Sequence, residues 1–270
     1  MTTRMTTMHR PRLWGAALML VLLQACATGP NANPHDPLEP FNRGMTRFND
    51  GLDKAVLKPA AQLYQGVTPA PVRTGVGNFF GNLSDVWSMV NNALQLKPKE
   101  TVETLMRVGV NTLFGFGGVL DVASEMRLEK HREDFGLTLG HWGVGPGPYI
   151  VLPVLGPSTL RDSVALVAAD SRGDLVQRVD NVPTRNSLIV LRAVDLRASL
   201  LGAGDVIDQA ALDKYSFVRD AYLQRRRNHI GGKPEPEERY DLPEAAPGST
   251  GPAGKENLQN GNKTSPNTQN

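Results

Sequence analysis

Cysteine is nearly absent from the sequence, since Cys26 is the only one among 270 residues. A single cysteine excludes a disulfide, a zinc ribbon and a thiol redox pair within the chain. The five histidines form no H-E-x-x-H pattern. The sequence therefore predicts no metal site, and we expect no cofactor.

Long apolar runs are also missing. The run LWGAALMLVLL (residues 13–23) is shorter than the roughly 20 residues that a membrane-spanning helix needs. Three arginines precede it, as in a secretory signal, and L-Q-A-C follows it, which resembles a bacterial lipobox. We therefore predict that residues 1–25 are a lipoprotein signal peptide and that Cys26 is the acylated first residue of the mature protein. The alternative is an ordinary export signal, or an uncleaved anchor, in which the cysteine falls by chance.

A strong charge of one sign is the third absence. The full chain carries a formal charge of +2, and removal of the signal, with its three arginines and no acid, leaves −1. A near-neutral mature chain has no electrostatic footprint for nucleic acid, so no nucleic-acid partner is expected.

Composition divides the mature chain into three parts. Residues 26–37 hold three prolines and no large apolar side chain, which predicts a flexible tether. Residues 231–270 are rich in proline, glycine and asparagine, and they have too few apolar groups to offset the entropy of ordering, so a disordered tail is expected. The folded unit is predicted to be one domain of residues 38–230.

Within that domain the spacing of apolar residues is helical. One apolar stripe at spacings of three and four consists of Phe41, Met45, Phe48, Leu52 and Val56. Asn42, Asn49 and Asp53 form a polar face beside it. Further helices are predicted at 70–83, 84–96, 99–113, 158–170, 184–201 and 205–227. No series of alternating strands with hairpin turns is found, so the predicted fold class is all-α with glycine-rich connections.

Three short apolar segments are dense in glycine, namely residues 76–83, 111–123 and 149–156. They are far too short to span a bilayer. Such segments either lie in a membrane interface or are buried in a protein core, and periodicity does not separate the two.

The sequence HWGVGPGP (residues 141–148) raises the question of a phosphate-binding loop. Gly143 and Gly145 match the start of G-x-G-x-x-G, but the third position is Pro148, which has no N–H to donate to a phosphate. No Gly-Lys-Ser/Thr occurs in the chain either. We interpret the stretch instead as shaped backbone, in which glycines permit turns and prolines fix φ.

A hydrolase remains an alternative, because His141, Ser158 and Asp162 lie within 22 residues. Ser158 lacks the G-x-S-x-G context that exposes a nucleophile. A structural role is simpler: Ser158 or Thr159 caps a helix, and Asp162 lies in its first turn, where the helix dipole favours a carboxylate.

Four stretches together resemble the MlaA, or VacJ, family of outer-membrane lipoproteins. They are DPLEPFNRGMTRFNDGLD (36–53), NTLFGFGGVLDVA (111–123), EDFGLTLGHWGVGPGPYIVLPVLGPSTLRD (133–162) and RDAYLQRRR (219–227). The resemblance covers the whole folded unit in the same order and leaves out the C-terminal tail.

The resemblance implies a non-enzymatic, membrane-associated helical ring in the periplasmic leaflet of the outer membrane. It implies that the ring associates with a trimeric porin and passes mislocalised phospholipid from the outer leaflet through an amphipathic channel. A soluble periplasmic carrier, similar to MlaC, would then take the lipid, which maintains lipid asymmetry.

Two groups of residues are our candidates for the lipid path. Asn42, Asn49 and Asp53 are candidates for its wall or gate. A second group is expected to shape the path or its rim: Gly143, Gly145, Gly147, Pro148, Tyr149, Arg161 and Asp162. The alternatives are a periplasmic lipid esterase that uses Ser158 and His141, and a structural envelope lipoprotein.

Overall fold

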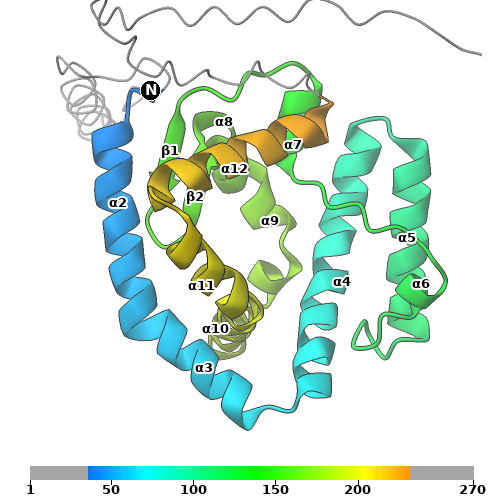
Figure 1. Cartoon of the computed structure of the whole chain (residues 1–270). Coiled ribbons are helices and arrows are strands. Elements are labelled where there is room, and N and C mark those ends of the chain that lie inside the picture. Colours follow the sequence, from blue (N-terminus) through cyan, green and yellow to red (C-terminus); the bar gives the residue numbers. More distant parts are fainter. Residues whose placement is uncertain (1–35, 232–270) are drawn as a thin grey trace, which may run out of the picture. The chain divides into compact units, whose positions relative to one another are not determined.

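The computed structural model describes residues 36–231 (Figure 1). The predicted signal peptide, Cys26 and nearly all of the tether and tail lie outside the described residues. The chain folds into α2 (Glu39–Leu52), π-helical η1 (Asp53–Leu57), α3 (Lys58–Val67), α4 (Ala70–Leu94), α5 (Pro98–Leu113), α6 (Val122–Glu125), α7 (Phe135–His141), β1 (Tyr149–Leu152), β2 (Gly156–Thr159), α8 (Leu160–Ala165), π-helical η2 (Leu166–Asp170), α9 (Ser171–Gly173), the 3-10 helix η3 (Leu175–Arg178), α10 (Val182–Ser199), α11 (Leu201–Ala210) and α12 (Lys214–Ile230). The predicted helical fold class is confirmed, with one small sheet added.

Several predicted helix boundaries are wrong. The two helices expected at 70–83 and 84–96 form the single helix α4, because no helix-breaking residue separates Leu83 from Ser84. The helix expected at 205–227 is two helices, divided at residues 211–213, where the Asp213 side chain caps α12 by accepting a hydrogen bond from the Tyr215 N–H.

The two strands form an antiparallel hairpin that the sequence pattern did not predict. Tyr149 pairs with Thr159 and Leu152 with Gly156. Val154 in the connecting turn has a φ of +67°, and Gly156, the first residue of β2, has a φ of +83°. Strands of four residues are too short for a convincing period-two pattern, and the residues that pair with β1 read as the start of a helix.

The elements of the described unit contact one another around a closed circuit. α2 contacts β1, β2 contacts α12, α12 contacts α7, and α7 contacts α4. α4 in turn contacts α10, which packs on α3, the continuation of α2 and η1. The α5–α6 segment packs against α4, outside this circuit, as Figure 1 shows. The arrangement is a ring with one flanking helical layer.

Burial in this ring is inverted relative to a water-soluble domain. Among the described residues, buried polar side chains outnumber buried apolar ones, and the largest buried apolar clusters hold three residues each. Large apolar side chains are instead exposed along most elements, including Leu63 on α3, Leu105 on α5, Phe116 after it and Val167 on η2. Large apolar side chains exposed in this number are typical of a surface that contacts a membrane or a protein partner. No described helix is long and apolar enough to cross a membrane.

Candidate functional site

Two neighbouring cavities lie against the same side of α4. Cavity 1 has a volume of about 590 Å³ and is bounded by α3, α4, α10 and the loop before α7. Cavity 2 has a volume of about 550 Å³ and is bounded by α4, the same loop, η2 and the end of α12. Four residues line both cavities: Gly77, Gly81, Lys130 and Arg132. None of the exposed large apolar side chains lines either cavity.

The acidic groups of cavity 1 are engaged within the protein. Asp195 accepts a hydrogen bond from the Tyr64 hydroxyl at 2.9 Å. Asp121 accepts hydrogen bonds from Arg107, Asn111 and Ser124. Burial opposes its ionisation, yet these donors outweigh that effect and lower the pKa of Asp121 to about 2. Asp121 is therefore a fixed anion at neutral pH.

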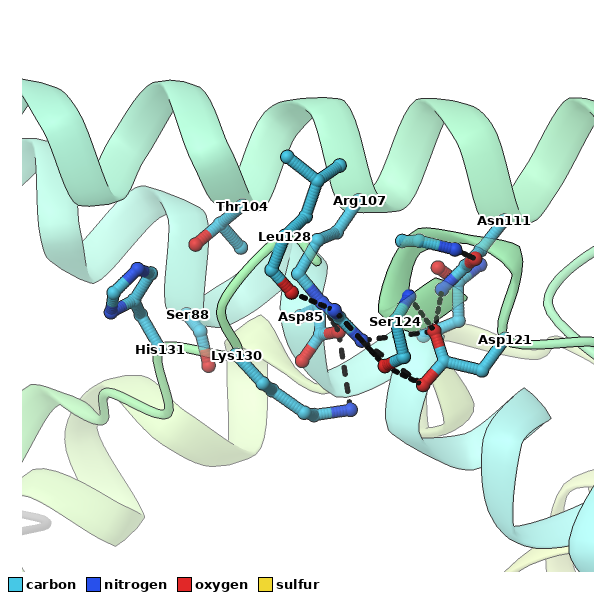
Figure 2. A network of polar contacts seen from close by, with 12 residues as sticks. Asp85, Ser88, Thr104, Arg107, Asn111, Asp121, Ser124, Leu128, Lys130 and His131 are labelled. Carbon is cyan, nitrogen blue, oxygen red and sulfur yellow. Dashed lines mark hydrogen bonds and ion pairs between the residues drawn. The ribbon is translucent and has the colours of Figure 1, made fainter. Parts of the chain in front are cut away.

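A buried polar network fastens the glycine-rich loop after α5 to α4 and α5 (Figure 2). Arg107 is 1% exposed and donates to both Asp121 oxygens, at 3.0 and 3.2 Å, and to the Leu128 carbonyl. Asn111 donates to Asp121 at 3.0 Å and accepts from the Ala123 N–H at 2.8 Å. The network holds residues 121–128 in place, and so fixes where the loop with Lys130 begins.

Asp85 on α4 is the least satisfied member of that neighbourhood. Its carboxylate is 1% exposed, and neither oxygen accepts a hydrogen bond of normal geometry from a described residue. The Lys130 Nζ lies 3.2 Å from Oδ2 and the Arg107 Nε lies 3.8 Å from it (Figure 2). Burial raises the pKa of Asp85 above its usual value despite these cations.

The three polar residues predicted to line the path on helix 40–56 have other neighbours. Asn42 is buried and contacts the Tyr149 carbonyl and the Val151 N–H, while Asn49 contacts the Leu152 carbonyl and the Val154 N–H. Asp53 forms a two-pronged ion pair with Arg197 at 2.6 and 2.8 Å. None of the three lines cavity 1 or 2. They hold the frame of the ring, and a role in gating stays a prediction.

The glycine- and proline-rich stretch 143–148 is an exposed connection between α7 and β1. Gly143 and Gly147 have φ of +87° and +67°, which L side chains rarely adopt. The carbonyls of Pro146 and Pro148 accept from the N–H groups of Arg161 and Leu160. Gly145 and Pro148 line neither central cavity. The stretch therefore sets how α7 approaches the hairpin, and its part in lipid passage stays a prediction.

Three other residues of that predicted group are buried beside it. The Arg161 side chain donates to the Val144 carbonyl at 3.2 Å and to Asp162 at 2.9 Å. Tyr149 packs against Tyr215 and Tyr222. Together they join the glycine-rich connection to α8 and α12.

Asp162 lies in the first turn of α8 and also contacts two residues of α12. Thr159 is the N-cap of α8, as predicted, since its Oγ1 accepts from the Asp162 N–H. The Asp162 carboxylate lies 2.9 Å from Arg226 and accepts from the Tyr222 hydroxyl at 2.8 Å. Burial opposes ionisation of Asp162, but Arg226 and Arg161 outweigh it and lower its pKa. Arg226, in the basic last part of α12, is only 7% exposed and also pairs with Asp134.

The structure does not bring the alternative hydrolytic pair together. The Ser158 Oγ lies 2.9 Å from the Ser163 Oγ and also donates to the Thr159 carbonyl. His141 is exposed at the end of α7, where its ring meets the edge of Trp142. Ser158 therefore has a local structural role in β2.

Within residues 36–231, the structure brings together one group of possible metal ligands that the sequence did not predict. Glu103, Glu129 and His131 place ligand atoms within 4.8 Å of one another. The His131 Nε2 is already hydrogen-bonded to Glu103 at 2.6 Å, and Lys99 lies 3.7 Å from the same glutamate. These contacts account for the cluster as an anchor between α5 and the loop before α7.

Comparison with known protein families shows which family this chain belongs to. Residues 34–229 match the family model described as MlaA lipoprotein. The chain belongs to the MlaA lipoprotein family. The matched range contains the whole ring and both cavities.

Relatives of known name cover most of the chain. The intermembrane phospholipid transport system lipoprotein MlaA of Escherichia coli (strain K12) is 38% identical over 242 residues, 84% of this chain and 92% of the relative. The protein of the same name from Haemophilus influenzae is 34% identical and covers 85% of this chain and 94% of the relative. A solved structure, described as the structural basis for maintenance of bacterial outer membrane lipid asymmetry, matches with a TM-score of 0.64 and 37% identity over 72% of this chain and 98% of that chain.

Proposed function

We propose that this MlaA-family chain removes mislocalised phospholipid from the outer leaflet of the outer membrane and passes it through the two central cavities towards the periplasm. The lipid is then taken by a soluble periplasmic carrier, so that lipid asymmetry is maintained. The named relatives belong to an intermembrane phospholipid transport system, and the matching solved structure concerns outer-membrane lipid asymmetry.

The observation that carries the proposal is the inverted distribution of polarity. Cavity 1 is lined mostly by polar and charged side chains, and cavity 2 combines charged groups with apolar side chains such as Phe80, Trp87 and Leu137. Many other large apolar side chains are exposed elsewhere on the ring. A phospholipid headgroup is costly to place in hydrocarbon without polar partners, whereas acyl chains favour apolar surroundings. A ring with charged groups along its cavities and an apolar exterior offers a headgroup path inside a membrane leaflet.

We further propose that a lipid anchor and a porin hold the ring in the membrane. Acylation of Cys26 anchors the mature chain in the periplasmic leaflet of the outer membrane, and a trimeric porin supports the ring laterally. The exposed apolar residues of the segment after α5, such as Phe114 and Phe116, provide a surface of the right polarity for lipid tails or for the apolar belt of a porin.

Complementation tests the function. The full chain is expressed in a Gram-negative strain that lacks its own family member, and phospholipid in the outer leaflet is quantified. We expect the chain to restore a low outer-leaflet content, and the Cys26→Ser variant to fail because it lacks the anchor. A chain that is present in the outer membrane at normal abundance but leaves outer-leaflet phospholipid high would refute the proposal.

A further inference from the structure

The wall shared by the two cavities has an unusual composition. It consists of two glycines on one face of α4, Gly77 and Gly81, and two cations of the loop that faces them, Lys130 and Arg132. A Cβ added at Gly81 would lie 2.9 Å from the Lys130 Nζ, so the lysine head occupies the space that the glycine leaves open. The ammonium group is thereby placed at the boundary between cavity 1 and cavity 2.

Most charged groups around this boundary have partners within the protein, and Arg132 is the exception. The acids of cavity 1 are engaged by Tyr64 and by the Arg107 network. In cavity 2, Glu133 pairs with Lys97, Asp134 with Arg226 and Asp174 with Arg192. Arg132, by contrast, is exposed to both cavities, and no hydrogen bond or ion pair of its side chain is found within residues 36–231. Of the two cations at the boundary, Lys130 is paired with Asp85, and Arg132 is the one for which no paired anion is found among the described residues.

Asp85 is the one acid that faces Lys130, and it is a poor permanent partner. The carboxylate is 1% exposed, and its oxygens accept no hydrogen bond of normal geometry from described residues. Its nearest cation is Lys130 at 3.2 Å, and the second, Arg107 at 3.8 Å, is already engaged by Asp121. A buried carboxylate in this condition costs free energy. A better anion arriving in the cavity can compete with it for the lysine.

We propose that Lys130 and Arg132 form a binding site for the phosphodiester of a phospholipid at the boundary between the two cavities, with Asp85 as a positioning residue that holds Lys130 while the site is empty. This inference rests on the proposed function and specifies how the headgroup is recognised along the path. A phosphodiester offers two acceptor oxygens that share one negative charge, and these suit one ammonium and one guanidinium group at this boundary.

Competition between Asp85 and the phosphate for Lys130 predicts that substitutions of the cations and of Asp85 change phosphate affinity in opposite directions. Replacing Lys130 or Arg132 removes a charge-assisted contact and weakens phosphate binding. Replacing Asp85 with asparagine removes the competing anion, so phosphate binding becomes tighter. A purely structural role for the Asp85–Lys130 pair predicts that both kinds of variant bind lipid less well or equally well.

Binding is measured on the full chain in detergent with monomeric short-chain phosphatidylglycerol as the probe. Short-chain diacylglycerol, which lacks the phosphate, and inorganic phosphate are the comparison ligands. Arg132→Gln is expected to weaken the binding of phosphatidylglycerol by about tenfold, the equivalent of one charge-assisted hydrogen bond. Lys130→Gln is expected to act in the same direction and Asp85→Asn in the opposite one, while diacylglycerol binding stays constant in all three. Lys99→Gln, on the outer helix α5 and outside both cavities, is the matched control and leaves every affinity unchanged.

Three results would overturn the site. An unchanged affinity in Arg132→Gln, or weaker binding in Asp85→Asn, contradicts the proposed competition. Inorganic phosphate that binds as tightly as phosphatidylglycerol shows a free anion, and not a lipid, to be the ligand. Lys130→Gln removes the nearest cation from the buried Asp85 carboxylate and therefore lowers the stability of the fold. If that variant unfolds, Arg132→Gln provides the test, because Arg132 is exposed. If these binding tests fail while the wild-type chain still restores lipid asymmetry in cells, the subsite is wrong and the proposed function stands.

Discussion

Asn42 satisfies two backbone groups of the hairpin at once, donating to the Tyr149 carbonyl at 3.0 Å and accepting from the Val151 N–H at 2.8 Å. Asn49 repeats the pattern on the Leu152 carbonyl and the Val154 N–H, three residues further along. Seven helical residues advance about 10.5 Å and three strand residues about 10 Å, so the two periods match. One face of α2 thus pairs with β1 and the following turn.

Replacing these two asparagines with alanine should give unequal losses of stability. Asn42→Ala leaves a buried carbonyl and a buried N–H unpaired and is expected to cost about 2–4 kcal/mol. Asn49→Ala uncovers groups beside an exposed turn that water can reach, so a cost below about 1.5 kcal/mol is expected. Unfolding in detergent, followed by circular dichroism, measures both. Equal losses would contradict this account of the hairpin.

Arg226 joins α12 to two acids, Asp134 before α7 and Asp162 on α8. Arg226→Gln removes the cation that Asp134 and the buried Asp162 share. Because Asp162 keeps Arg161 and the Asp134 side chain is 39% exposed, we expect a loss of about 2–3 kcal/mol, below the full range for breaking a buried ion pair. The neighbouring Arg225 is the control, because it is exposed and no ion pair of its side chain is found within the described ranges. If Arg225→Gln lowered the unfolding temperature as much as Arg226→Gln, the buried network would not be what fixes α12.

Asp85→Asn should stabilise the fold in a pH-dependent way. Burial raises the pKa of Asp85 above its usual 3.8, so the ionised carboxylate at neutral pH costs the folded state free energy. The asparagine removes that cost. The gain over wild type is fully present above the raised pKa, declines as pH falls through it and vanishes below 3.8, where the carboxyl is protonated in both states. Unfolding curves recorded at several pH values check this, and a gain that grew on acidification would have the wrong sign.

Two glycine-to-alanine substitutions should have opposite effects. A Cβ at Gly173 would lie 2.2 Å from the Trp87 ring, whose Nε1 is held by Asp170. Gly173→Ala is therefore expected to destabilise the fold by about 1–3 kcal/mol through overpacking. Gly109, within α5, has no neighbour within 4 Å of an added Cβ, so Gly109→Ala should stabilise by about 0.5–1 kcal/mol. Thermal unfolding of both variants measures the contrast, and the same sign for both would contradict the packing described here.

Local patterns predicted the helices better than the site. The stripe on helix 40–56 and the Thr159 cap follow from short-range spacing, and both are found in the structure. The same spacing placed Asn42 and Asn49 on one face, but it could not reveal that the hairpin covers that face. Lys130 and Arg132 lie in a loop without periodicity, and their shared wall exists only because α4 and that loop meet in the fold. Such contacts have no signal in a single sequence.

Passage of phospholipid through the two cavities is tested most directly by blocking them. Cys26 is the only native cysteine. Single cysteines are therefore placed in cavity 1 by Thr74→Cys, in cavity 2 by Ser84→Cys and outside both cavities on α5 by Lys99→Cys. Outer-leaflet phospholipid is then quantified in complemented cells before and after modification with a bulky thiol reagent. We expect phospholipid to accumulate after modification of either cavity variant and not of the Lys99→Cys control. Unchanged asymmetry after complete modification of both cavity variants would contradict transport through the ring.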